Sequence, residues 1–117
     1  MKDNLILDKS FEFAVSVVNL YKYLTAEKHE FVLSKQILRS GTSIGANVKE
    51  AVVAQSRKEF VAKMNISLKE ANETEYWILL LGRTGYIDDA NRLLEETRSI
   101  IRILTSIIKS TNDYTQT

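Results

Sequence analysis

The stretch RSGTSIGANVKEA, from Arg39 to Ala51, decides the fold of this chain. In a helix, its small and apolar residues recur at alternating spacings of four and three and form one stripe. Gly41 and Gly45 lie four residues apart, which in a water-facing helix bundle favours close approach of a neighbouring helix. We therefore expect a helix that packs closely along this stripe, which comprises Ile37, Gly41, Ile44, Val48 and Ala51.

A second, polar row follows the same helix along one flank of that stripe. Two interpretations are open: a recognition or assembly surface, or a hydrogen-bond network that ties this helix to its neighbour. The second is favoured, because buried polar groups nearly always find partners inside the protein. The row consists of Gln36, Ser40, Ser43, Asn47 and Glu50.

Composition extends the helical prediction to the whole chain. The 117 residues contain no proline and only four glycines, so long helices have few interruptions. This length fits one domain, residues 1–117. The chain lacks cysteine, which removes disulfides and thiolate metal sites and makes the cytoplasm the expected compartment. No apolar run reaches the about 18 residues of a membrane span.

Four helical periods are predicted, at about 8–27, 31–54, 57–83 and 88–111. Asp8 and Asp88 are expected N-caps, Ser56 with Glu59 matches a capping box, and Gly85 is an expected helix terminator. Long helices joined by short turns pack antiparallel. The sequence thus predicts an all-α fold, an antiparallel up-down-up-down four-helix bundle.

The apolar residues of the first, third and fourth helices cover more of the helix surface than a single bundle needs. In the first helix, Phe11, Ala14, Val18, Tyr21 and Thr25 form the expected core stripe. Additional apolar residues either thicken the core or mark contact with another subunit, and we expect self-association. The predicted subunit interface comprises Phe13, Val17 and Leu20 in the first helix and Ile66, Trp77 and Leu80 in the third.

Catalytic and metal chemistry lack the residues they need. Glu70, Glu73 and Glu75 resemble the acids of a metal site in a bundle, but such sites also need a Glu-x-x-His pair. His29 is the one histidine and falls in a predicted turn, so neither a metal site nor a nucleophilic triad is expected. We predict no catalytic residue, no cofactor, no metal and no small-molecule substrate.

Charge is unevenly distributed along the chain. Residues 32–69 carry seven basic and two acidic groups, and residues 70–96 carry two and seven. An antiparallel bundle would gather the basic groups at the turn between the second and third helices, where they could contact phosphates. The candidate nucleic-acid contacts are Lys49, Arg57, Lys58 and Lys63.

Three segments together carry a resemblance to a known family: Arg39–Ala51, SRKEFVAKM (Ser56–Met64) and KEANETEYWILLL (Lys69–Leu81). The chain resembles the small four-helix proteins encoded within intervening sequences of bacterial 23S rRNA genes, and the related accessory proteins of diversity-generating retroelements. The resemblance implies a ring-like pentamer, and the retroelement relatives associate with a reverse transcriptase and nucleic acid.

The expected function is a non-enzymatic homo-oligomer that binds RNA, DNA or a nucleoprotein partner electrostatically. The alternative is a protein-interaction scaffold without nucleic-acid binding, which docks a partner through its acidic end and the face around Trp77. The acidic end lies opposite the basic turn and gathers Glu27, Glu30, Asp88, Asp89, Glu95 and Glu96. Salt dependence would separate the two, since phosphate binding weakens steeply with salt and an apolar contact does not.

Overall fold

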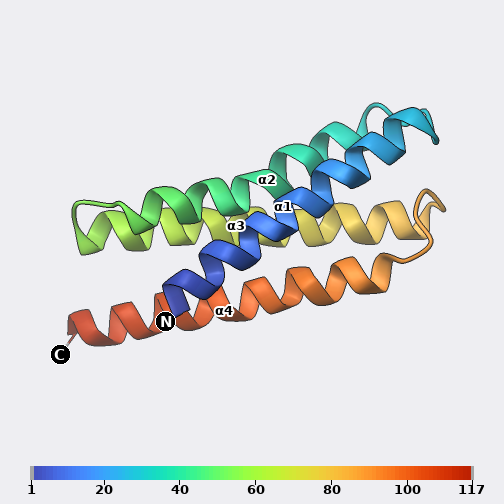
Figure 1. Cartoon of the computed structure of the whole chain (residues 1–117). Coiled ribbons are helices and arrows are strands. Elements are labelled where there is room, and N and C mark those ends of the chain that lie inside the picture. Colours follow the sequence, from blue (N-terminus) through green and yellow to red (C-terminus); the bar gives the residue numbers. More distant parts are fainter. Residues whose placement is uncertain (1, 117) are drawn as a thin grey trace.

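The computed structural model describes the backbone of residues 2–116 and the side chains of residues 4–112. Four helices make up the structure: α1 (Lys2–Ala26), α2 (Leu33–Val52), α3 (Arg57–Arg83) and α4 (Ala90–Gln116). Consecutive helices alternate in direction, and α1 crosses the bundle obliquely from α4 toward α2 (Figure 1). The molecule measures 51 by 22 by 21 Å. The predicted all-α four-helix bundle is confirmed.

Helix boundaries agree best with the prediction where the chain carries strong end signals. For α3, the predicted range and the observed range are the same. The other helices differ: α1 begins at Lys2 rather than Asp8, α2 is shorter at both ends, and α4 spans Ala90–Gln116 rather than 88–111. The early start of α1 follows from Ile6, which is completely buried and continues the core stripe by another turn. Asp8 therefore lies inside the helix and is not its N-cap.

Both ends of α3 are closed by hydrogen bonds that the sequence predicts. Ser56 Oγ accepts from the Glu59 N–H at 3.0 Å, and Glu59 Oε2 accepts from the Gln55 N–H at 3.1 Å. At the other end Gly85 adopts a φ of 85°, and the Tyr86 N–H donates to the Leu81 carbonyl at 3.0 Å. This is a Schellman ending, which needs a left-handed residue and so favours glycine.

The turn between α1 and α2 is built on a carboxylate. Glu30 Oε1 accepts from the Ser34 N–H at 2.8 Å and from the Val32 N–H at 3.2 Å, so it satisfies open donors at the start of α2. Partial burial opposes ionisation of Glu30, but these backbone hydrogen bonds outweigh it and hold the pKa of the carboxyl below its usual range. His29, with a φ of 52°, supplies the left-handed residue of this turn.

The stripe of α1 that faces the core is not the one predicted. Phe13 and Val17 are 2% and 0% exposed, so they are core residues and their assignment to a subunit interface is wrong. Leu20 is partly buried against the same core. Phe11, predicted as core, is 65% exposed. The true stripe contains Ser10 between Ile6 and Phe13, and this polar residue makes it look less apolar than its neighbour.

Glycines in α2 explain why the stripe of α1 that contains Ser10 and Val17 faces inward. A Cβ at Gly41 would lie 2.7 Å from Val17 Cγ2, and a Cβ at Gly45 would lie 3.2 Å from the Ser10 carbonyl oxygen. Only a residue without a side chain allows α2 to lie this close to α1. The close approach expected at Gly41 and Gly45 is therefore present, and Val17 and Ser10 are the residues it brings against α2.

Candidate functional site

The polar flank of α2 faces α3 and is joined to it by buried hydrogen bonds. Thr74 Oγ1 donates to Ser40 Oγ at 2.9 Å, and Ser67 Oγ donates to the Ile44 carbonyl at 2.8 Å. These hydroxyl-bearing side chains are fully buried. Two hydrogen bonds inside the core fix the relative position of the helices, because a shift would leave buried polar atoms unpaired.

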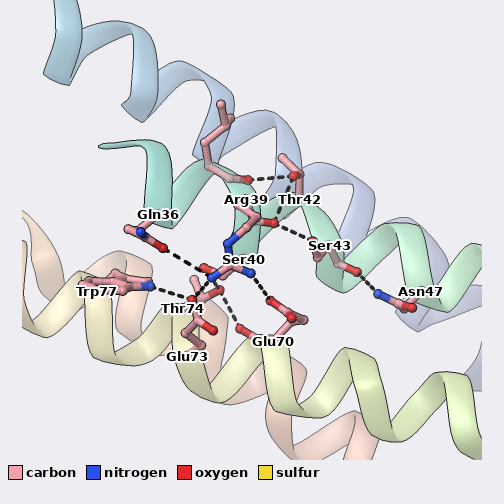
Figure 2. A network of polar contacts seen from close by, with 11 residues as sticks. Gln36, Arg39, Ser40, Thr42, Ser43, Asn47, Glu70, Glu73, Thr74 and Trp77 are labelled. Carbon is pink, nitrogen blue, oxygen red and sulfur yellow. Dashed lines mark hydrogen bonds and ion pairs between the residues drawn. The ribbon is translucent and has the colours of Figure 1, made fainter. Parts of the chain in front are cut away.

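Arg39 extends this network to the surface. Its guanidinium donates to Glu70 Oε2 at 3.3 Å and forms an ion pair with Glu73 (Figure 2). The same Glu73 carboxylate accepts from the Trp77 indole N–H at 2.9 Å. Arg39 thus bridges two turns of α3, and Trp77 is held through one of the acids it binds.

The five residues of the predicted row divide between two kinds of contact. Ser40 and Glu50 reach α3, the latter through an ion pair between Glu50 Oε1 and Lys63 Nζ at 3.0 Å. Gln36, Ser43 and Asn47 instead bond to groups of α2 itself. Ser40 thus makes the buried contact that an internal network requires, whereas Glu50 reaches α3 through an ion pair in which its side chain is 58% exposed.

The residues of α3 that complete the network also carried a signal in the sequence. Ser67 and Thr74 recur in the third helix at spacings of three and four with the buried residues Met64, Ala71 and Ile78. A polar residue on a core stripe must find a hydrogen-bond partner across the interface. Pairing that stripe with the polar row of the second helix would have identified the contact.

The three acids that resemble a metal site in the sequence form ion pairs with arginines. Glu70 and Glu73 bind Arg39, and Glu75 Oε2 accepts from Arg98 Nε of α4 at 2.8 Å. Within the described residues, no group of three or more histidine, cysteine or acidic side chains is arranged to hold a metal ion. His29 is exposed in the α1–α2 turn.

The four candidate cations lie around the turn from α2 to α3, which we call the basic end. Lys49 and Lys58 are exposed, and Lys63 is partly buried in its ion pair with Glu50. Arg57 lines a shallow hollow at the turn together with Phe60 and Thr111. Of the acids near these cations, Glu50 binds Lys63 and Glu59 caps α3, whereas Asp8 and Glu12 line a groove together with Lys49.

Exposed apolar side chains lie on α1, on α3 and at both ends of α2, where they are Phe31, Val32, Val52 and Val53. On α1 the exposed residues include Leu5, Phe11 and Val15, of which Phe11 lines a groove of 580 Å³ between α1 and α2. On α3 they are Ile66, Tyr76 and Leu79. Of the predicted interface residues of this helix, Ile66 is exposed, whereas Trp77 and Leu80 are partly buried.

The apolar excess predicted for α4 is absorbed by the core of a single chain. Leu94, Ile100 and Leu104 are buried, and Leu93, Ile101 and Ile103 pack against the core from its edge. Among the described residues, no helix is long and apolar enough to span a membrane. The unused apolar surface therefore belongs mainly to α1 and α3.

Fold and contacts define a small antiparallel four-helix protein whose second and third helices are joined by an internal polar network. The chain belongs to the 23S rRNA-intervening sequence protein family, whose model matches residues 2–106. This confirms the family named by the resemblance.

A solved structure is similar throughout. It is the crystal structure of a protein with unknown function from the S23 ribosomal protein family of Bacteroides thetaiotaomicron, which is 60% identical with a TM-score of 0.91. The match covers 93% of this chain and 99% of that one. No curated protein matches this chain.

Proposed function

We propose that this protein is a non-enzymatic homo-oligomer whose basic end binds the phosphate backbone of RNA or DNA. The observation that carries the proposal is the exposure of Lys49 and Lys58 at one turn, where the two acids of the turn itself, Glu50 and Glu59, are engaged with Lys63 and with the start of α3. Exposed cations attract phosphate and release counterions when it binds. Repetition of this end in an oligomer would add several weak contacts into useful affinity.

The descriptions of the similar proteins make RNA the first ligand to test. The matched family is named for an intervening sequence of 23S rRNA, and the crystal structure is assigned to a ribosomal protein family. We propose that binding depends on the RNA backbone, because the described residues of the basic end include no large exposed aromatic side chain of the kind that stacks on bases. We also place the protein in the cytoplasm, since a chain without cysteine has no disulfide that requires an oxidising compartment.

The absence of enzymatic activity is part of the proposal. Catalysis by acid and base needs titratable groups with shifted pKa values in a shared site. Here Glu70, Glu73 and Glu75 form ion pairs with arginines along the helix faces, and His29 lies in an exposed turn. These contacts support a structural role for the acids.

A protein-interaction scaffold remains the second candidate, and one observation favours it. Tyr76 is 59% exposed and packs edge-on against Trp77 with 5.0 Å between ring centroids. Exposed aromatic residues are enriched in protein interfaces. In this alternative a partner protein docks on the aromatic pair.

RNA binding by charge-reversed variants separates the two candidates. The test variant is Lys49→Glu with Lys58→Glu, and the control is Lys22→Glu with Lys35→Glu, which changes the net charge equally at exposed positions outside the basic end. Lys63 is left unchanged because it is already bound to Glu50. Fluorescence anisotropy with a labelled single-stranded RNA should be measured at 50 and 200 mM salt.

We expect the test variant to bind at least about tenfold more weakly than the control, with a shallower dependence on salt. Equal affinities of the two variants would refute the basic end as the site. Failure of the unmodified protein to bind RNA at either salt concentration would favour the scaffold.

A further inference from the structure

Exposed residues of α3 form one straight strip on the side of the helix that faces away from the bundle. They recur at alternating spacings of four and three, which keeps them on a single face, and the buried residues from Met64 to Leu81 lie on the opposite face. We define the α3 strip by its charged, amide and aromatic members, which are Lys58, Asn65, Lys69, Asn72, Tyr76 and Arg83.

No acid interrupts the α3 strip. Within residues 4–112, its three cations form no ion pair with an acid. The carboxylate of Glu59, beside Lys58, accepts a backbone hydrogen bond at the start of α3. The later acids of α3 are held by Arg39 of α2, as Figure 2 shows for the first two, or by Arg98 of α4; they are Glu70, Glu73 and Glu75.

The cations of the strip are spread along the helix rather than clustered. With a rise of about 1.5 Å per residue, Lys58 and Lys69 lie about 17 Å apart along the axis, and Lys69 and Arg83 lie about 21 Å apart. A compact anion would reach only one of them. A nucleic-acid strand carries a phosphate at every nucleotide and would reach all three. The spacing therefore matches an extended polyanion.

Near the C-terminal end of the strip, Tyr76 offers a surface for a base. Its side chain is 59% exposed, and its ring packs edge-on against Trp77. A hollow of 540 Å³ lies beside Tyr76 and is also lined by Arg83 and Asn91. Asp88 is the one acid that lines this hollow, and a carboxylate there can accept a hydrogen bond from the amino group of a base.

We propose that single-stranded RNA lies along the α3 strip, with its backbone on Lys58, Lys69 and Arg83 and one unpaired base against Tyr76. This rests on the RNA binding in the proposed function and extends that site from the basic end along α3, since Lys58 belongs to both surfaces. An RNA duplex does not suit the strip, because its bases are paired and its major groove is too deep and narrow for side chains to read. The bases of a single strand are free to stack on an aromatic ring.

Reversal of the two cations that lie outside the basic end tests the path of the backbone. The test variant is Lys69→Glu with Arg83→Glu, and the control is Lys22→Glu with Lys35→Glu, which changes the net charge equally at exposed positions outside the strip. The probe is a labelled single-stranded RNA of about 16 nucleotides, the upper end of common single-strand site sizes. Fluorescence anisotropy at several salt concentrations gives the affinity and its salt dependence.

We expect the test variant to bind about tenfold more weakly than the control. Its slope of log affinity against log salt should be about 1.4 shallower, because each phosphate contact with a single strand contributes about 0.7. Circular dichroism verifies that each variant is folded.

Replacement of the aromatic ring tests the base contact separately. Tyr76→Ala should weaken binding about tenfold without changing the salt slope, because stacking involves no counterion release. Tyr76→Phe keeps the ring and should bind like the unmodified protein. The control is Tyr23→Ala, which removes a ring that is 41% exposed on α1, and it should also leave binding unchanged. An RNA duplex of the same length should bind the unmodified protein and Tyr76→Ala equally.

The outcomes separate this inference from the proposed function. Tyr76→Ala binding like Tyr23→Ala would overturn the base contact, and equal affinities of the two charge-reversed variants would overturn the backbone path. RNA binding that still depended on Lys49 and Lys58 would then leave the proposed function intact. Failure of the unmodified protein to bind the RNA would refute both, and would leave the exposed Tyr76 to a partner protein.

Discussion

Helix α2 is held by its two neighbours in different ways. Toward α3 it presents hydroxyls and charges, with Ser40 bound to Thr74 and Arg39 to Glu70. Toward α1 it presents glycines, and Val17 fills the space at Gly41. The polar contact specifies one register through its hydrogen bonds, whereas the glycine contact specifies it through shape. Both depend on small residues in the segment Arg39–Ala51.

The largest effect is expected where shape alone sets the distance between helices. Gly41→Val should lower the free energy of unfolding by about 3 kcal/mol, because the new side chain would overlap Val17 and force α1 away. Chemical denaturation measures the change, with Ala46→Val at an exposed position of the same helix as the control. Adding Val17→Ala should recover part of the loss, and a purely additive result would contradict the direct contact.

The free energy of unfolding should change by different amounts when the donor or the acceptor of the buried hydrogen bond between α3 and α2 is removed. Thr74→Val removes the donor to buried Ser40 and should cost about 1 to 2 kcal/mol in the free energy of unfolding. Ser40→Ala should cost less, because the Thr74 hydroxyl can then direct its single hydrogen to the Glu70 carbonyl, which lies 2.8 Å from Oγ1.

A double-mutant cycle sharpens this prediction. Ser40→Ala together with Thr74→Val should be no less stable than Thr74→Val alone, since no buried hydroxyl then lacks its partner. A cost equal to the sum of the two single changes would indicate that the hydroxyls stabilise the bundle independently.

The turn that joins α1 to α2 contains a further contact, between the Glu30 carboxylate and the start of α2. Glu30→Gln should lower the free energy of unfolding near neutral pH by about 0.5 kcal/mol, because a neutral amide caps α2 less well than a carboxylate. The pKa of Glu30 is lowered in the folded protein, so the stabilisation is complete above the ordinary pKa of 4.5 and is lost as pH falls through the folded value.

Denaturation of the two proteins at several pH values tests this sign. The difference between the unmodified protein and Glu30→Gln should disappear in acid. A difference that persists at the lowest pH would show that the carboxylate charge is not the source of the effect.

The smallest effect is expected at the other residue of this turn. His29→Gly removes the cost of a left-handed backbone, which is about 1 kcal/mol, but increases the freedom of the unfolded chain. The two terms nearly cancel, so thermal unfolding should show a stability change within about 0.5 kcal/mol of zero. A loss of more than this would assign a stabilising role to the contact between the His29 and Phe31 rings.

Prediction from the sequence succeeded where a signal is local. The ends of α3 follow from Ser56, Glu59 and Gly85, whose side chains or backbone act within a few residues. It failed on α1, where two stripes have the same spacing and Ser10 interrupts the one that is buried. Periodicity identifies that a helix has faces, but it does not state which face meets a neighbour.

For the candidate surfaces, the sequence identified the residue types and the structure decided their availability. Lys49 and Lys63 are equivalent as basic residues in a count of charges, yet Lys63 is bound to Glu50 and Lys49 is exposed. This distinction depends on which helix faces are adjacent, and no local pattern contains it.

By itself, the sequence determined the four helices, their antiparallel order and the close approach at Gly41 and Gly45, since helix propensity, end signals and residue size are properties of short segments. Only the tertiary structure decided that Phe13 and Val17 lie inside and Phe11 outside. It also decided that the acids of α3 turn toward Arg39 and Arg98. These outcomes depend on the simultaneous packing of several helices, which selects among faces that are equivalent in a single helix.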